Sequence, residues 1–322
     1  MSARTLVLLS ALLAIACKSP AKETVSETPT TTPAATAPSA PTTKAPGTDP
    51  ISYSGSFGAK TGYAKIKVGG RDRRVYVYVP ATSAAKPALV MAFHGTGSNL
   101  DDGAHDAAIS ELGIREVADA NGFIVVAPFS TSDGGVNADH EDGGDGWRFD
   151  GDAASNLDLA LTRASIQEAT RAYGVDTARI YAVGHSNGAF FAYFAAMKLA
   201  DRFAAFAETS GGMIPCGKRV DCTFARRGAT SCSALLSAAP ASCKCPVGAA
   251  AFPTVKPNGR VPPGFLKHNA DDSIVSAAFT CRLAEHLGPR ARVSLDGAGD
   301  HGPTNDFMAK AWAFLATKSL AD

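Results

Sequence analysis

The sequence has no marked excess of positive or negative charge. Its 322 residues include 31 Lys and Arg against 30 Asp and Glu, a formal net charge of +1. Proteins that bind nucleic acid or acidic polymers usually present a marked basic excess. The balance therefore gives no reason to expect nucleic acid as a partner.

The apolar run near the start, LVLLSALLAIA over residues 6–16, is too short to span a bilayer. Arg4 precedes it and small residues follow it, which is typical of an export signal. We expect a lipoprotein-type signal peptide over residues 1–17, with Cys17 as the lipidated residue. The protein would then be exported and held at the bacterial cell envelope, with the lipid as its only membrane contact. Ordinary secretion after cleavage is the alternative.

Aromatic side chains are absent from residues 18–50, which contain seven prolines and many Thr and Ala. Such a segment cannot bury enough apolar surface to offset its ordering entropy, so we predict a disordered tether. Residues 51–322 are long enough for one domain with a full core. We find no internal repeat, and the oligomeric state cannot be predicted.

Within residues 51–322, short buried-type strands alternate with helical patterns. Strands are expected at 88–95, 123–129, 179–185, 203–211, 263–269 and 292–297, and helices at 103–122, 156–174, 189–202 and 310–320. Residues 63–68 and 73–80 instead alternate like antiparallel edge strands. This order predicts an α/β class with a mostly parallel central sheet and helices on both faces.

One short segment has the pattern of a nucleophile site. Residues 184–188 read Gly-His-Ser-Asn-Gly, between an apolar strand and a helical stretch. A turn this sharp needs glycine on both sides of Ser186, and it leaves the hydroxyl exposed at the start of a helix. Ser186 is therefore the candidate nucleophile. An ordinary strand-to-helix turn is the alternative.

A serine hydroxyl needs a base and an orienting carboxylate, which follow it in the chain in this architecture. His301 lies in a glycine-rich loop after a strand and is the candidate base, whereas His286 reads as a partly exposed residue at a helix end. Asp272 follows the preceding strand and is the candidate acid. Asp271 is the alternative, with helix capping or solvent exposure as its other possible role.

Residues 94–97, His-Gly-Thr-Gly, end a buried-type strand where a backbone could approach a bound carbonyl. We expect the backbone amides of Thr96 and Asn187 to form an oxyanion hole. His94 is interpreted as a structural histidine that hydrogen-bonds this loop.

Candidate substrate contacts are His185 and Trp147. Trp147 lies in the glycine-rich acidic segment 137–158, where it could stack on a substrate ring or instead fill the core. The segment lacks EF-hand spacing, so a solvated acidic loop is favoured over a calcium site. No metal or cofactor is expected.

Six cysteines follow Cys17, and five of them fall between residues 216 and 245. Export, an even count and the absence of paired CxxC spacing favour three disulfides over a metal knuckle. The disulfides would staple an insert at residues 213–260. Cys281 would connect this region to the helix after the acid loop.

These motifs resemble a known family. HGTGSN at 94–99, GW at 146–147, the stretch 156–193, ETSGG ending at Gly212, HNADDSIV and GDHG are similar to an α/β-hydrolase group of secreted esterases. That group includes polyhydroxybutyrate depolymerases and feruloyl or acetylxylan esterases. The resemblance implies an α/β-hydrolase fold and places the acid on Asp272. Asn269 departs from it, since glycine is usual there.

The expected activity is hydrolysis of a polymer-linked or aromatic carboxylic ester by two-step acyl transfer, as in polyhydroxybutyrate depolymerases and feruloyl esterases. An acetylxylan esterase or a serine peptidase of the same fold is the alternative, and a non-catalytic binding protein is a further one. The identity of the ester cannot be predicted from the motifs.

Overall fold

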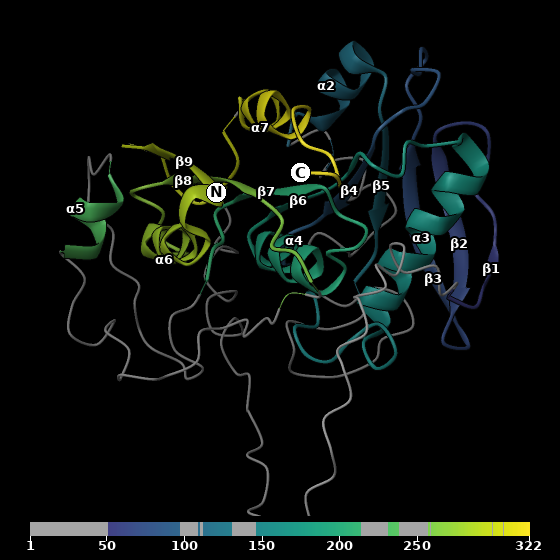
Figure 1. Ribbon diagram of the computed structural model, residues 1–322, viewed down its shortest axis with the longest axis horizontal. Coiled ribbons are helices and arrows are strands. Elements are labelled where there is room, and N and C mark those ends of the chain that lie inside the picture. The colour runs from purple at the N-terminus through teal and green to yellow at the C-terminus, as the bar shows by residue number, and fades with distance from the viewer. Residues whose placement is uncertain are drawn as a thin grey trace, which may run out of the picture.

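A mixed sheet runs through the computed structural model, which describes residues 51–96, 109, 112–130, 146–213, 231–237, 257, 259–297, 299–304 and 306–322. Within these residues the strand order is β1-β2-β3-β5-β4-β6-β7-β8-β9 (Figure 1). The strands are β1 (Tyr53–Gly55), β2 (Gly62–Val68), β3 (Arg71–Tyr78), β4 (Leu89–Phe93), β5 (Ile124–Pro128), β6 (Ile180–His185), β7 (Ala205–Thr209), β8 (Gly264–Asn269) and β9 (Ala291–Asp296).

The sheet has an antiparallel part and a parallel part. Strands β1, β2 and β3 pair antiparallel, and β3 joins β5 in the same sense. From β5 through β9 every pairing is parallel. The carboxyl ends of the parallel strands therefore lie along one edge, which is where α/β sheets bind ligands.

Helices cover both faces of the sheet (Figure 1). They are α2 (Ile114–Asn121), α3 (Leu157–Tyr173), α4 (Asn187–Lys198), α5 (Cys232–Ser237), α6 (Ala277–Leu287), the 3₁₀ turn η2 (Gly288–Arg290) and α7 (Phe307–Leu315). Side chains of α3, α4 and α6 belong to one buried apolar cluster, and those of α2 and α7 to another. The two clusters form the core on opposite faces of the sheet.

The central strands form because their sequences suit burial on both faces. The residues of β4 (LVMAF) and β5 (IVVAP) are all buried, as is usual for parallel strands covered by helices. In β2, exposed and buried positions alternate toward the end of the strand, which suits a more peripheral position. The expected strands and the mostly parallel sheet are thus confirmed.

Local capping explains where α3 begins and ends. The Asn156 side chain accepts hydrogen bonds from the amides of Asp158 and Leu159 at 2.9 and 3.0 Å. The helix ends at Gly174, whose φ of 62° is left-handed and favours glycine. The expected helix at 156–174 is therefore confirmed to within a residue at each end.

Two elements were not expected from the sequence. Strand β1 adds three residues at one sheet edge, and α5 lies inside the predicted cysteine-rich insert. The expected helix at 103–122 is described as α2 over its second half only, since most of residues 103–111 lie outside the described residues. Residues 1–50, with the predicted signal and tether, also lie outside them.

One disulfide lies within the described residues. Cys232 of α5 is bonded to Cys281 of α6, with 5.2 Å between their Cα atoms. The bond connects the insert to the helix after the acid loop, as expected. The other four cysteines of the predicted disulfides, Cys216, Cys222, Cys243 and Cys245, lie outside the described residues.

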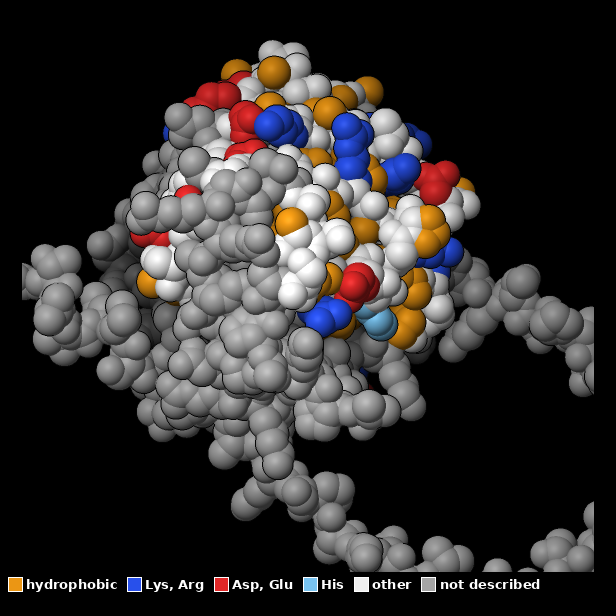
Figure 2. Space-filling model, turned by 90° about the vertical axis from the view of Figure 1, so that its left-hand side faces the viewer, with side chains coloured by type: hydrophobic (Ala, Val, Ile, Leu, Met, Phe, Trp, Pro, Cys, Tyr) orange, Lys and Arg blue, Asp and Glu red, His pale blue; other side chains and the backbone are white. Residues whose placement is uncertain are grey.

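Figure 2 views the side of the molecule at the left of Figure 1, where β8, β9, α5 and α6 lie. Among the side chains that the structure describes on this face, basic, acidic and apolar ones are interspersed. Among the described helices, none has both the length and the apolar composition needed to cross a membrane.

Candidate active site

Ser186 lies in the turn between β6 and α4, at the carboxyl edge of the sheet. Its φ of 54° and ψ of −122° are strained for a residue with a side chain. The amide of Ser186 donates to the carbonyl of Thr209 at the end of β7, 3.0 Å away. Such strain at one polar residue indicates a functional turn, as the Gly-His-Ser-Asn-Gly pattern predicts.

The two glycines of this turn are required by close backbone contact. A Cβ atom on Gly184 would lie 2.0 Å from the carbonyl oxygen of Gly188. A Cβ on Gly188 would lie 2.1 Å from the carbonyl oxygen of Phe93 at the end of β4. The turn is therefore packed against the neighbouring strand, and the backbone fixes the position of Ser186.

Ser186, His301 and Asp272 lie together in one hydrogen-bonded series. The Nε2 atom of His301 is 2.9 Å from the Ser186 hydroxyl oxygen. Its Nδ1 atom is 2.9 and 3.1 Å from the two carboxylate oxygens of Asp272. In this arrangement the hydroxyl donates to Nε2 while Nδ1–H donates to the carboxylate, which makes His301 able to accept the serine proton.

Asp272, rather than its neighbour Asp271, contacts His301. Its Oδ1 atom also accepts from the amides of Ile274 and Val275, at 2.9 and 2.8 Å. Burial alone would raise the pKa of Asp272, but hydrogen bonds from His268 and His301 outweigh burial and hold the pKa below its usual range. The carboxylate is therefore charged when it faces the imidazole.

The loop that carries His301 is tied to the end of β8. The Asn269 side-chain amide donates to the carbonyl of Asp300 at 2.8 Å and to that of Gly302 at 3.3 Å, on either side of His301. The Asp300 carboxylate accepts from the Ser273 hydroxyl at 2.6 Å and from the Ser273 amide at 2.9 Å. The Asn269 side chain therefore contributes directly to holding the loop.

Two further histidines lie near the serine turn. The His185 ring is 5.0 Å from the His301 ring, and burial lowers the pKa of His185 to about 3. Burial likewise lowers the pKa of His94 to about 4. The Nε2 atom of His94 accepts from the Ser130 amide at 3.3 Å, so its Nδ1–H donates to the Gly95 carbonyl at 2.7 Å. This agrees with a structural role for His94.

The loop after β4 lies against the nucleophile turn. A Cβ on Gly95 would be 3.3 Å from the Cβ of Ser186, so a side chain there would require its neighbours to shift by a few tenths of an ångström. Thr96 follows it, and Asn187 is the first residue of α4. The two backbone amides expected to form the oxyanion hole thus lie in the two segments that meet at Ser186.

Trp147 belongs to the core. Its indole is fully buried, stacks on Phe191 with 4.6 Å between ring centroids, and meets Phe93 edge-on. Its Nε1–H donates to the carbonyl of His94 at 2.8 Å, and its backbone amide donates to the Asn187 side chain at 2.7 Å. The assignment of Trp147 as a substrate contact is therefore wrong. The indole instead supports the loops around Ser186.

The end of the acidic segment also differs from expectation. Asp158 is fully buried and pairs with the equally buried Arg73 at 2.9 Å, so it is not part of a solvated loop. Asp150 pairs with Arg148 at the surface. Residues 131–145, which include most of the acidic side chains, lie outside the described residues.

Several polar residues around the series were not predicted from the sequence. Glu208, Thr280 and His268 form a buried group behind Asp272, and Asn269 and Asp300 hold the base loop. A pattern that could have pointed to His268 is its spacing, four residues before Asp272. His286 is exposed near the end of α6, as expected.

Comparison with curated proteins finds esterases. A bifunctional acetylxylan esterase/xylanase of Neocallimastix patriciarum is 31% identical over 149 residues, which is 46% of this chain and 19% of that protein. Feruloyl esterase B of Talaromyces stipitatus is 29% identical over 44% of this chain and 37% of its own length. Acetylxylan esterase A of Aspergillus ficuum is 30% identical over 44% of this chain and 43% of its own length. The matches thus span less than half of each relative. No protein-family model matches the chain.

Solved structures give the same fold over most of the chain. An acetyl xylan esterase from Aspergillus awamori matches with a TM-score of 0.51 at 14% identity, over 79% of this chain and 99% of that one. An S-formylglutathione hydrolase from Agrobacterium tumefaciens matches with a TM-score of 0.52 at 17% identity, over 82% of this chain and 98% of that one. The chain therefore has the α/β-hydrolase fold. In sequence it resembles the feruloyl and acetylxylan esterases.

Proposed function

We propose that this protein is a serine carboxylic-ester hydrolase that acts through Ser186, His301 and Asp272. The observation that carries the proposal is the continuous series from the serine hydroxyl to a buried carboxylate, with contacts of 2.9 Å at both ring nitrogens of His301. The series lies at the carboxyl edge of the sheet, on a strained turn. The resemblance to esterases in sequence supports the same activity.

The proposed reaction is acyl transfer in two steps. His301 takes the proton of Ser186 as the oxygen attacks the ester carbonyl, and then gives it to the departing alcohol. Asp272 holds the imidazole with Nδ1 protonated and stabilises the imidazolium. The amides of Thr96 and Asn187 stabilise the oxyanion, each by about 3 kcal/mol. Water then releases the acyl group by the same route in reverse.

We further propose an aromatic or polymer-linked acyl ester as the substrate. Support comes from the relatives, one named feruloyl esterase B and another acetylxylan esterase A. The former name describes an aromatic acyl group, and the latter an acetyl group on a polysaccharide. His185 is the proposed substrate contact, since its ring lies 5.0 Å from the ring of the proposed base, His301.

The test is a substrate screen with purified residues 51–322. We expect hydrolysis of p-nitrophenyl acetate and of methyl ferulate, with Ser186→Ala as the matched blank and His286→Ala as the surface control. Acetylated xylan and poly(3-hydroxybutyrate) films then separate the polymer classes. Cleavage of peptide amides without ester hydrolysis would replace this proposal with a peptidase.

Export is a separate proposal, based on the apolar run before Cys17 and the proline-rich stretch after it. Fractionation of cells that produce the full chain, compared with Cys17→Ser, tests it. We expect the native chain in the membrane fraction and the variant outside it. An unmodified mature N-terminus beyond Cys17 would instead favour plain secretion.

A further inference from the structure

A second imidazole, that of His268, also contacts the candidate acid. His268 lies near the end of β8 and is fully buried. Its Nε2 atom is 3.2 Å from Oδ2 of Asp272 and 2.9 Å from the carbonyl oxygen of Val275. Both of these atoms are hydrogen-bond acceptors, so Nε2 carries the proton and donates.

The other side of the His268 ring continues into a buried polar group. Its Nδ1 atom is 2.7 Å from the Thr280 hydroxyl of α6. The same hydroxyl is 3.0 Å from a carboxyl oxygen of Glu208 on β7 and 3.3 Å from the Gly211 carbonyl. Thr280 and Glu208 are fully buried too. Two strands and one helix thus meet through three polar side chains.

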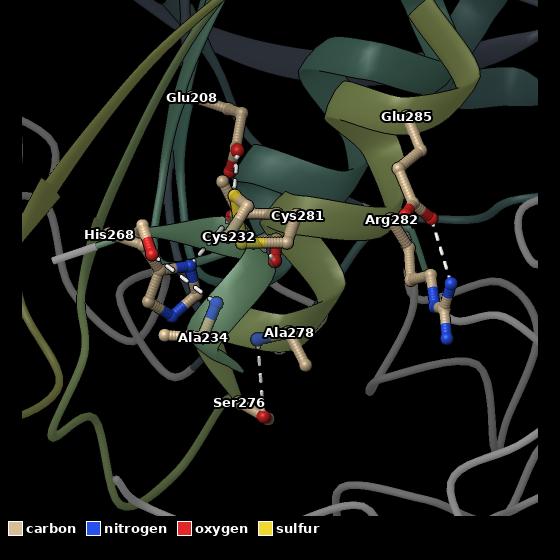
Figure 3. The surroundings of a disulfide bond; sticks show 12 residues. Glu208, Cys232, Ala234, His268, Ser276, Ala278, Cys281, Arg282 and Glu285 are labelled. Carbon is tan, nitrogen blue, oxygen red and sulfur yellow. Dashed lines mark hydrogen bonds and ion pairs between the residues drawn. A yellow bond between two sulfur atoms is a disulfide. The ribbon is translucent and has the colours of Figure 1, made fainter. Parts of the chain in front are cut away.

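Figure 3 shows how these elements meet. Glu208 and His268 extend from the sheet toward α6, beside Cys281. Cys281 directly follows Thr280 and is bonded to Cys232. The disulfide therefore fixes the helix turn that carries the Thr280 hydroxyl.

The protonation of Glu208 sets the direction of these hydrogen bonds. Burial raises the pKa of Glu208 to about 8, so at neutral pH the carboxyl keeps its proton and can donate. Thr280 then accepts from Glu208 and donates to Nδ1 of His268, which requires the ring to carry its proton on Nε2. Each donor has an acceptor along the path from Glu208 to Asp272. The positions of these protons follow from the network.

We propose that His268 is a positioning residue for Asp272, held in one tautomer and one orientation by Thr280 and Glu208. It acts through Asp272, whose Oδ2 atom it shares with His301. The inference rests on the proposed function, because it concerns the acid of the same catalytic series.

Energetics agree with this role. Among the hydrogen bonds that keep the Asp272 carboxylate ionised, the bond from His268 has the larger effect on its pKa and the bond from His301 follows. Without His268, Oδ2 would keep a hydrogen bond from His301 alone, while Oδ1 would keep those from the amides of the following turn. The orientation of the carboxylate toward His301 would then be less constrained. A misplacement of about 1 Å in such a site can cost roughly 100-fold in rate.

The decisive comparison is Thr280→Val against Thr280→Ser. Valine keeps the shape but has no hydroxyl, so Nδ1 of His268 loses its donor, whereas serine retains it. We expect Thr280→Val to lower kcat on p-nitrophenyl acetate roughly 10- to 100-fold with KM nearly unchanged. Thr280→Ser should restore most of kcat. Thr162→Val is the matched control, because Thr162 is a buried threonine of α3 that donates to the Asp158 carbonyl at 2.8 Å.

A second readout separates positioning from loss of stability. The Nδ1 proton of His301 gives a low-field NMR resonance when it is bonded to a fixed carboxylate. That resonance should shift or broaden in Thr280→Val and return in Thr280→Ser. If Thr280→Val does not fold, Glu208→Gln replaces it. Its amide still donates to Thr280, so its loss in kcat should be smaller than tenfold, accompanied by a smaller shift of the same resonance.

The outcomes distinguish this inference from the proposed function. A wild-type protein without ester hydrolysis would overturn the proposed function, and this inference with it. An active wild type with a folded Thr280→Val of normal kcat would overturn the positioning role alone. Equal losses of kcat in Thr280→Val and Thr280→Ser, or in Thr280→Val and Thr162→Val, would also overturn it.

Discussion

The two halves of the candidate active site are held in different ways. The nucleophile half, made of β4, β6 and α4, fixes Ser186 through backbone contacts at Gly184 and Gly188. The acid–base half, made of β8, β9 and α6, fixes Asp272 and His301 through side-chain hydrogen bonds. In the first half, Gly184 and Gly188 leave no space for a Cβ atom. In the second, each position depends on a donor and an acceptor from different parts of the chain.

This difference has a consequence for how each half responds to mutation. A backbone turn that excludes a Cβ atom is distorted when a single methyl group is added. A hydrogen-bonded loop is instead spoiled by removing one donor or acceptor, while its shape is kept. Substitutions that add volume should therefore damage the nucleophile half most, and isosteric substitutions should damage the acid–base half.

The largest effect is expected from the charged end of the series. His301→Ala and Asp272→Asn should each lower kcat by roughly 10³-fold or more, because the base or its tautomer is lost. Asp271→Asn is the matched control, since Asp272 rather than Asp271 contacts His301. Steady-state kinetics on p-nitrophenyl acetate measures the three variants. A greater loss of kcat in Asp271→Asn than in Asp272→Asn would instead assign the acid to Asp271.

Glu208→Gln tests the buried carboxyl of the acid–base half through stability. The pKa of Glu208 rises from 4.5 to about 8 on folding, so the native protein keeps a proton that the unfolded chain releases. The wild-type protein therefore loses stability relative to Glu208→Gln as the pH rises from about 4.5 to 8. Above pH 8 the difference in stability between the two proteins stays constant.

Over that window the free energy of unfolding should diverge by on the order of 3 to 5 kcal/mol. Urea unfolding of both proteins at pH 5, 6.5 and 8 measures the divergence. If the free energies of unfolding of the two proteins change in parallel with pH across this range, Glu208 is already ionised in the folded wild-type protein.

Much of the fold, and the side-by-side placement of Ser186, Asp272 and His301, could be predicted because their determinants are local. A strand, a glycine-bounded serine and a helix occur within residues 179–202, and Asp272 and His301 each follow a recognisable strand. The contact between Glu208 and Thr280 joins residues 72 positions apart. No local pattern contains it.

Burial explains the other differences from expectation. Trp147 lies in a glycine-rich, acidic segment that reads as a surface loop, yet its ring fills the space between Phe93 and Phe191. Asp158 pairs with Arg73, which is 85 residues earlier. In both cases the partner that accounts for burial is distant in sequence.

Gly188→Ala should spoil the nucleophile half. The added methyl group would approach the carbonyl oxygens of Phe93 and His94 to 2.1 and 2.4 Å. Overpacking of this kind costs about 1 to 3 kcal/mol and displaces the backbone, so both thermal stability and kcat should fall. Gly58→Ala is the control, because a Cβ there meets nothing closer than 3.9 Å. Calorimetry and kinetics on both variants would detect the effect, and equal behaviour would contradict a packed turn.

Asn269→Asp should have a smaller effect, on the base loop alone. The substitution keeps the shape but replaces the amide donor with a carboxylate that faces the carbonyls of Asp300 and Gly302. We expect kcat to fall roughly tenfold, about 1.4 kcal/mol, through a displaced His301. Asn121→Asp is the control, since Asn121 makes a similar amide-to-carbonyl bond at the end of α2. If the two variants have the same kcat, Asn269 does not hold the loop.

The central claim is that Ser186, activated by His301, is the acylated nucleophile. Mass spectrometry after reaction with a fluorophosphonate tests it most directly. The account predicts one adduct per molecule on Ser186, loss of ester hydrolysis in step with labelling, no adduct in Ser186→Ala and much slower labelling in His301→Ala. An adduct on another residue, or an unlabelled protein that still hydrolyses esters, would contradict it.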